Sequence, residues 1–130
     1  MKAQDATTAS STPVIATSTE TIIAVEWTFD TLVAYLAEKY DQNEALARRI
    51  IKCESKNKAN AVGHNRNRAG EIWSRDYGYW QINDYWNHKT ALDRGFDVKN
   101  DWQDNLEFGF IMLSERGTQP WNASKYCWMA

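Results

Sequence analysis

Three stretches of the chain repeat their apolar residues at the spacing of an α-helix, and this pattern limits the possible folds more than any other feature. The stretches cover residues 31–40, 43–55 and 101–115. Apolar side chains spaced in this way share one helix face, and that face must pack against another apolar surface. We therefore expect several helices that surround a common core.

Residues that favour helix ends stand at the borders of these stretches. Asp30 is the candidate cap of the first helix, and Asp41 with Glu44 stands in the relation of a capping box before the second. Gly117 follows the third stretch where a C-cap glycine belongs, and Pro120 lies just beyond it.

The middle of the chain lacks this period. Residues 56–71 are polar and irregular, so we expect a long loop, whereas 72–83 is rich in Trp, Tyr and Ile and indicates a short strand or hairpin. A short helix is expected over 85–92. The predicted fold class is therefore α+β, mostly α, with a small central β element.

The first 26 residues differ from the rest, because they are rich in Thr, Ser and Ala. Such a segment buries too little apolar surface to offset its ordering entropy. We expect a disordered tail over 1–26 and one folded domain over 27–130. No run of 18 apolar residues predicts a membrane span, and no export signal is visible because the N-terminus lacks an apolar signal-peptide core.

The net charge of the chain is −2, and residues 27–130 carry 14 acidic and 14 basic side chains. A neutral domain has no overall electrostatic footprint for nucleic acid and no basic stripe for an anionic membrane, so we expect neither partner. His64 and His88 lack ligand partners at metal spacing, and we expect no metal and no cofactor.

The two cysteines, Cys53 and Cys127, lie too far apart in sequence for a CxxC motif. Two interpretations stay open on the residues alone. One is a long-range disulfide in an oxidising compartment, and the other is a pair of unpaired buried thiols.

Glu54 is the first candidate catalytic residue. It ends the second predicted helix on the side of Ile50 and Ile51, and a carboxyl held against apolar groups has a raised pKa. A glycosidase needs such a group to protonate the leaving oxygen near neutral pH. The alternative is an ordinary solvated glutamate at a helix end.

Asp76 is the second candidate, in a polar and aromatic setting beside Arg75. A hydrogen-bonded, partly wet site would keep this carboxyl ionised. Two carboxyls in contrasting environments suit the roles of acid and of nucleophile or stabiliser. The alternative is an ordinary turn aspartate.

Two strings carry a family resemblance: Cys53-Glu54-Ser55, and Ser74-Arg75-Asp76-Tyr77-Gly78-Tyr79-Trp80-Gln81-Ile82-Asn83. Together they resemble the active-site strings of the lysozyme-like superfamily, above all the soluble lytic transglycosylase type. The second string is also similar to one in animal c-type lysozymes, a relative that supplies the standard example of paired glycosidase carboxyls. Asn105 and the ending from Gly117 to Trp128 extend the resemblance over about residues 43–128.

The resemblance implies a lysozyme-like catalytic domain over 27–130 that cleaves the β-1,4 bond between N-acetylmuramic acid and N-acetylglucosamine. It implies Glu54 and Asp76 as catalytic residues, a disulfide between Cys53 and Cys127, peptidoglycan glycan strands as the partner, and a monomeric protein outside the cell or in its envelope. The residues implied to bind substrate are Ser55, Ser74, Tyr79, Trp80, Gln81, Asn83 and Asn105.

Alternatives remain for several of these side chains. The amides of Gln81 and Asn83 suit sugar hydroxyls and N-acetyl groups, but local turn bonding would use the same atoms. Trp73, Tyr79 and Trp80 suit stacking on sugar faces, and core packing suits them equally.

The chain departs from the family pattern at two positions. Lys56 stands where many transglycosylases have Gly, and Asp76 stands where many have Ala or another non-acid. An enzyme without that carboxylate is expected to form an anhydro product, so Asp76 leaves hydrolysis by water open. A non-catalytic glycan-binding module and an accessory component of a virion or envelope remain alternative functions.

Overall fold

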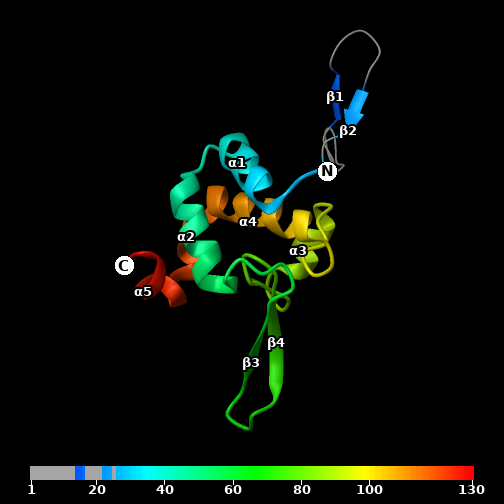
Figure 1. Ribbon diagram of the computed structural model, residues 1–130. Coiled ribbons are helices and arrows are strands. Elements are labelled where there is room, and N and C mark those ends of the chain that lie inside the picture. The colour runs from blue at the N-terminus through cyan, green and yellow to red at the C-terminus, as the bar shows by residue number, and fades with distance from the viewer. Residues whose placement is uncertain (1–13, 17–21, 25) are drawn as a thin grey trace.

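The computed structural model describes residues 14–16, 22–24 and 26–130 (Figure 1). The fold is α+β and mostly helical, with a small three-stranded antiparallel sheet, which confirms the predicted fold class. The elements of the domain are α1 (Phe29–Lys39), α2 (Glu44–Ser55), β3 (Val62–Arg66), β4 (Ile72–Tyr77), β5 (Ile82–Asn83), α3 (His88–Asp93), α4 (Trp102–Arg116), η1 (Gln119–Ser124) and α5 (Lys125–Trp128).

The N-terminal segment contributes two short strands, β1 (Val14–Ala16) and β2 (Ile22–Ala24), which pair antiparallel. Most of the predicted tail over residues 1–26 lies outside the described residues. The expectation of a disordered tail therefore stays a prediction.

The start of α1 differs from the prediction. The N-cap is Thr28, whose hydroxyl accepts a hydrogen bond from the backbone N–H of Thr31, while the Thr31 hydroxyl accepts one from the Thr28 N–H. Asp30 lies inside the first turn, where a negative charge still interacts favourably with the helix dipole. It also pairs with Arg48 of α2.

The start of α2 differs as well. Asn43 is the N-cap and accepts a hydrogen bond from the Leu46 N–H, so the predicted capping box of Asp41 and Glu44 is wrong. Asp41 has a φ of 54° and forms the turn between the helices instead. For α4 the predicted end is confirmed, because Gly117 has a φ of 62° and its N–H donates to the Leu113 carbonyl.

The predicted long loop over 56–71 is wrong at residues 62–66, because β3 pairs antiparallel with β4 there. Figure 1 shows the two strands as a hairpin that projects from the helical body. The strand was hidden because its inward positions are Gly63 and Asn65, not large apolar residues. Exposed and partly buried residues alternate along β3, as in a regular strand, but apolar and polar residues do not alternate.

Trp80 joins the sheet region to the helices. Its side chain is 0% exposed, and its indole N–H donates to the Leu106 carbonyl in α4. Its backbone N–H donates to the Asn105 side chain, and its carbonyl accepts from the indole of Trp121 in η1. Three segments distant in sequence thus meet at one residue.

A buried ionic contact connects α1 and α4. The carboxylate of Glu107, a buried residue of α4, accepts hydrogen bonds from Lys39 and from the Tyr40 hydroxyl. Burial and the neighbouring carboxylate raise the pKa of Tyr40 above its usual range. The phenol therefore stays a donor to Glu107 throughout the neutral pH range.

A disulfide joins Cys53 of α2 to Cys127 of α5, and this confirms the first of the two interpretations of the cysteines. A disulfide is consistent with an oxidising location outside the cytoplasm. Among the described residues, no helix combines the length and the apolar character needed to cross a bilayer.

We predict that Gly109→Ala destabilises the protein, although Gly to Ala inside a helix ordinarily stabilises by up to about 1 kcal/mol. A Cβ at position 109 would meet the Trp80 ring at 2.0 Å. The expected loss is about 1–3 kcal/mol in the free energy of unfolding, measured by chemical denaturation. Ser114→Ala, on the exposed part of α4, is the control and should change stability by less than about 1 kcal/mol. A gain of stability in Gly109→Ala would contradict the tight Trp80 contact.

Candidate active site

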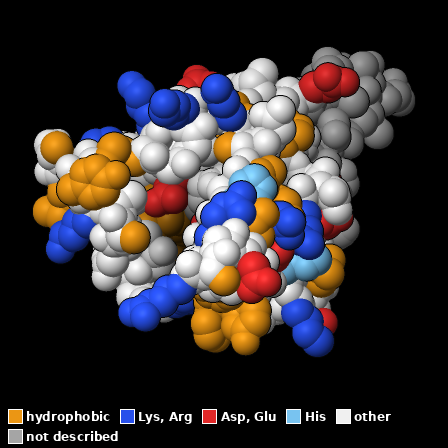
Figure 2. All heavy atoms as spheres, turned by 90° about the horizontal axis from the view of Figure 1, so that it is seen from below, with side chains coloured by type: hydrophobic (Ala, Val, Ile, Leu, Met, Phe, Trp, Pro, Cys, Tyr) orange, Lys and Arg blue, Asp and Glu red, His pale blue; other side chains and the backbone are white. Residues whose placement is uncertain are grey.

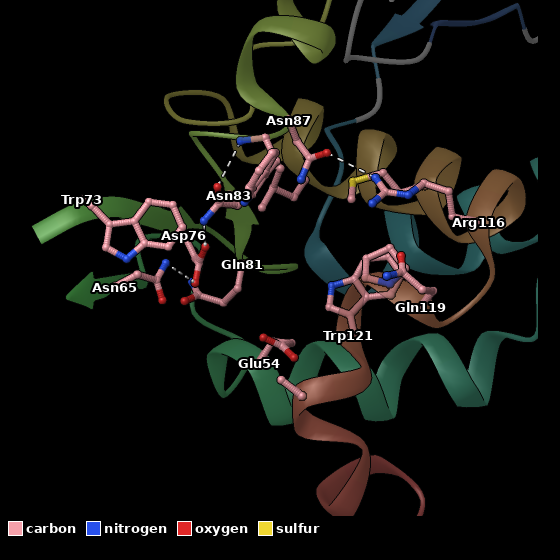
Figure 3. A pocket seen from close by; sticks show the side chains of 15 residues that line it. Glu54, Asn65, Trp73, Asp76, Gln81, Asn83, Asn87, Arg116, Gln119 and Trp121 are labelled. Carbon is pink, nitrogen blue, oxygen red and sulfur yellow. Dashed lines mark hydrogen bonds between the residues drawn. The ribbon is translucent and has the colours of Figure 1, made fainter. Parts of the chain in front are cut away.

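A cavity of about 380 Å³ lies between the sheet, the end of α2, and the segment from the end of α4 through η1 (Figure 3). Figure 2 shows the molecule from the side toward which the hairpin projects, where the surface is hollowed. The residues that line this cleft are Glu54, Asn65, Trp73, Asp76, Gln81, Ile82, Asn83, Trp86, Asn87, Met112, Arg116, Gln119, Pro120, Trp121 and Ala123.

Glu54 reaches the cleft from the last turn of α2, whose end is set by Lys56 in the left-handed conformation. The Ser124 hydroxyl of η1 donates a hydrogen bond to its carboxylate. Burial raises the pKa of Glu54, the Ser124 hydrogen bond opposes that rise, and the charge of Asp76 adds to it. The direction agrees with the sequence-based expectation.

Asp76 enters the cleft from β4. Its Oδ1 accepts a hydrogen bond of 2.7 Å from the Asn83 amide, and its Oδ2 accepts one of 3.2 Å from the Asn65 amide. Two neutral amides thus fix both oxygens of the carboxylate. Arg75, the neighbour expected to accompany Asp76, lies exposed and forms no ion pair within the described part of the chain, because adjacent strand residues point to opposite faces.

Gln81 and Asn83 both line the cleft, and both also bond locally. The Gln81 amide donates to the carbonyls of Ala61 and Gly78, and its oxygen leaves no room for a side chain at Gly63, since a Cβ there would lie 2.7 Å from Oε1. Asn83 accepts hydrogen bonds from two backbone N–H groups that follow it. The two amides therefore shape the cleft wall as well as facing it.

Ser74 lies directly behind the cleft. It is buried, and its hydroxyl accepts hydrogen bonds from the side chains of Asn65 and Asn83. These are the two amides that hold Asp76. Ser74 therefore orients the partners of the Asp76 carboxylate from a buried position.

The structure buries four other residues that were expected to bind substrate, and none of them lines the cleft: Ser55, Tyr79, Trp80 and Asn105. The Ser55 hydroxyl donates to the Ile51 carbonyl within its own helix, and Tyr79 stacks on Phe29.

The remaining two support the wall of the cleft from behind. The amide of Asn105 donates to the carbonyls of Tyr77 and Val98, and Trp80 belongs to the core. Within the string from Ser74 to Asn83, Tyr79 and Trp80 therefore belong to the core, whereas Gln81 and Asn83 line the cleft.

Trp73 faces the cleft because of an irregularity in the hairpin. Asn65 pairs with Ser74 but Arg66 pairs with Ile72, so β4 has one extra residue at Trp73. Such a bulge redirects a side chain from its regular alternation. The Trp73 ring, 48% exposed, packs edge-on against Tyr85 at the rim of the cleft.

Sequence reasoning missed several cleft residues. Asn65 was hidden in the segment expected to be a loop, and Ser124 stood in the C-terminal string without a role. Trp86, Asn87 and Arg116 stand in no motif, so no pattern in the sequence could have assigned them. Arg116 and Asn87 hydrogen-bond to each other at the far end of the cleft from Glu54 (Figure 3).

No group of three or more His, Cys, Asp and Glu side chains suited to a metal ion occurs in the described portion of the chain. The two carboxyls of the cleft differ in their surroundings, since one is partly desolvated and the other is held by amide donors. This arrangement can supply a proton from one wall and a negative charge from the other.

Comparison with known proteins gives no assignment, because no family model and no curated protein matches the chain. The resemblance carried by the two strings therefore stays a prediction.

We predict opposite changes in the pKa of Glu54 for two substitutions. Asp76→Asn removes a neighbouring negative charge and should lower the pKa, whereas Ser124→Ala removes a donor that favours the carboxylate and should raise it. The carboxyl resonance of Glu54, followed by NMR during a pH titration, measures both.

Asp93→Asn is the control for the titration, because Asp93 pairs with Lys89 on exposed α3 and does not line the cleft. It should leave the Glu54 curve unchanged. A shift of the same sign in Asp76→Asn and Ser124→Ala would contradict the assigned causes.

Proposed function

We propose that the protein is a peptidoglycan-cleaving glycosidase that acts outside the cytoplasm on the β-1,4 bond between N-acetylmuramic acid and N-acetylglucosamine. The observation that carries the proposal is the pairing of Glu54 and Asp76 in one cleft, with the pKa of Glu54 raised. A glycosidase of this kind needs one carboxyl that keeps its proton and one that remains charged.

In the proposed reaction, protonated Glu54 donates its proton to the glycosidic oxygen as the bond to the anomeric carbon breaks. Positive charge then develops on the sugar ring, and the Asp76 carboxylate, held by Asn65 and Asn83, stabilises it from the other wall. Water then attacks the anomeric carbon and returns a proton to Glu54. The products are two shorter glycans, with one water consumed.

The lining of the cleft supports a carbohydrate ligand. Trp73 and Trp86 are exposed at its rim, by 48% and 67%, and flat aromatic faces suit sugar rings. Asn87 and Gln119 add neutral hydrogen-bonding groups that match hydroxyls and N-acetyl groups. The aromatic rings and amides of the cleft thus suit the rings, hydroxyls and N-acetyl groups of an uncharged glycan backbone.

We predict that Glu54→Gln lowers cell-wall clearing by roughly 10²-fold or more, the usual contribution of a general acid. Glutamine keeps the size of the side chain and a hydrogen-bonding oxygen for Ser124, but it has no proton to donate. The measurement is the loss of turbidity of a bacterial wall suspension. Glu44→Gln is the matched control in the same helix, because Glu44 is exposed and pairs only with Arg48.

Equal clearing by the wild type and Glu54→Gln would remove Glu54 from the mechanism. Binding of the wild type to walls with no release of soluble fragments would favour a glycan-binding module over an enzyme.

We further predict that mass spectrometry of the fragments detects reducing ends that carry the added water. The reason is that Asp76 gives the charged intermediate a partner on the wall opposite Glu54, which leaves time for water to attack. An anhydro end, lighter by one water, would mean that the sugar's own 6-hydroxyl attacks and that Asp76 has a different role. Both products would result from cleavage of the same β-1,4 bond.

A further inference from the structure

A group of five basic side chains surrounds the hairpin, although the folded region as a whole is neutral. Residues 56–75 contain five cationic side chains and one anionic side chain, Glu71, for a net charge of +4. We call the five the basic hairpin surface: Lys56, Lys58, Arg66, Arg68 and Arg75. The overall charge count hides this separation, because the acidic side chains that balance it lie elsewhere in the chain.

All five side chains are exposed, and none forms an ion pair with a described residue. Of the nine basic residues in the rest of the domain, five likewise form no ion pair with a described residue, and four are paired with acidic neighbours: Lys39, Arg48, Lys89 and Arg94. The hairpin therefore carries positive charge that is not neutralised within the described structure.

Strand pairing places two of the five cations, Arg66 and Arg75, on the face of the hairpin opposite the cleft, while Lys56 and Lys58 precede β3 and Arg68 lies in the turn. Arg75 lies directly across from His64, and Arg66 is two residues further along the same face of β3. Figure 2, which looks at the molecule from the side toward which the hairpin projects, shows Lys and Arg side chains gathered beside a histidine. Arg66 pairs with Ile72 and Arg75 pairs with His64, so neither arginine has an anionic side chain directly across from it on the paired strand.

We propose that the basic hairpin surface binds a linear polyanion whose repeats are joined by phosphodiesters, a class of polymer attached to bacterial cell walls. The inference rests on the proposed function, which brings the chain to such a wall. The glycan would occupy the cleft while the phosphate polymer lies along the outer face of the hairpin. Three of the five cations are arginines, whose planar guanidinium groups match phosphate oxygens well.

The same residues argue for a polymer over other anionic ligands. A small anion needs a recessed site, whereas these side chains are exposed and distributed along the hairpin. A membrane surface is disfavoured because the turn over residues 67–71 (Asn, Arg, Ala, Gly, Glu) has no large apolar side chain to insert. A flexible chain with one charge per repeat can contact several cations at once.

The test is cosedimentation of the Glu54→Gln protein, which does not degrade its target, with Gram-positive cell walls. The walls are used intact, after hydrofluoric acid has removed their phosphate polymers, or after amidation of their carboxyl groups. We expect at least tenfold weaker binding at low salt to walls without phosphate, and little change after amidation. Added salt should weaken binding only to walls that retain phosphate.

A double substitution, Arg66→Gln with Arg68→Gln, should weaken binding to intact walls by roughly tenfold to thirtyfold and leave binding to phosphate-free walls unchanged. The matched control, Lys89→Gln with Lys125→Gln, removes the same charge from exposed positions outside the hairpin. Circular dichroism verifies that both proteins are folded.

Three outcomes would overturn the inference: equal binding to intact and phosphate-free walls, equal losses in the two double variants, or loss of binding on amidation of carboxyls alone. Cleavage of phosphate-free walls by the wild type is measured separately. No cleavage together with phosphate-dependent binding would reject the proposed enzyme and retain the basic surface.

Discussion

The close contact between the Trp80 indole and Gly109 is the constraint on which the rest of the structure depends. A side chain at position 109 would push the ring away from α4, and the hydrogen bond from the indole N–H to the Leu106 carbonyl would be lost. The Trp80 carbonyl also holds Trp121, and Trp121 lines the cleft three residues before Ser124. The packing of Trp80 in the core therefore helps to position the Ser124 hydroxyl that contacts Glu54.

The cleft has two walls that are built differently. The helical wall presents Glu54, whose proton affinity is set mainly by burial against α2 and η1. The sheet wall presents Asp76, held by a layer of amides and one hydroxyl: Asn65, Asn83 and Ser74. The contrast between the carboxyls therefore follows from the contrast between a helix end packed on apolar groups and a strand backed by polar side chains.

The sequence predicted the parts of this arrangement that depend on local periodicity. The main helices and the environment of Glu54 followed from apolar spacing, because a helix face is visible over a few turns, and the turn at Gly117 followed from a glycine at a helix end with a proline just beyond it. Strand β3 was missed because its inward residues are small or polar, and the caps Thr28 and Asn43 were missed because nearby aspartates were equally plausible candidates.

The assignment of side chains to the core or to the cleft could not be predicted. Trp80 and Trp73 are chemically equal, and only the packing against Gly109 and the extra residue in β4 separate their roles. Ser124 contacts Glu54, 70 residues earlier in the sequence, and Arg116 contacts Asn87, 29 residues earlier. Such contacts leave no local pattern in a single sequence.

The disulfide lies one residue before Glu54 on α2 and three residues after Ser124 on the facing segment. A covalent bond and a hydrogen bond therefore clamp the same two segments within about one helical turn of each other. Both links oppose sliding of one segment past the other, so together they hold Ser124 against Glu54 on the helical side of the cleft.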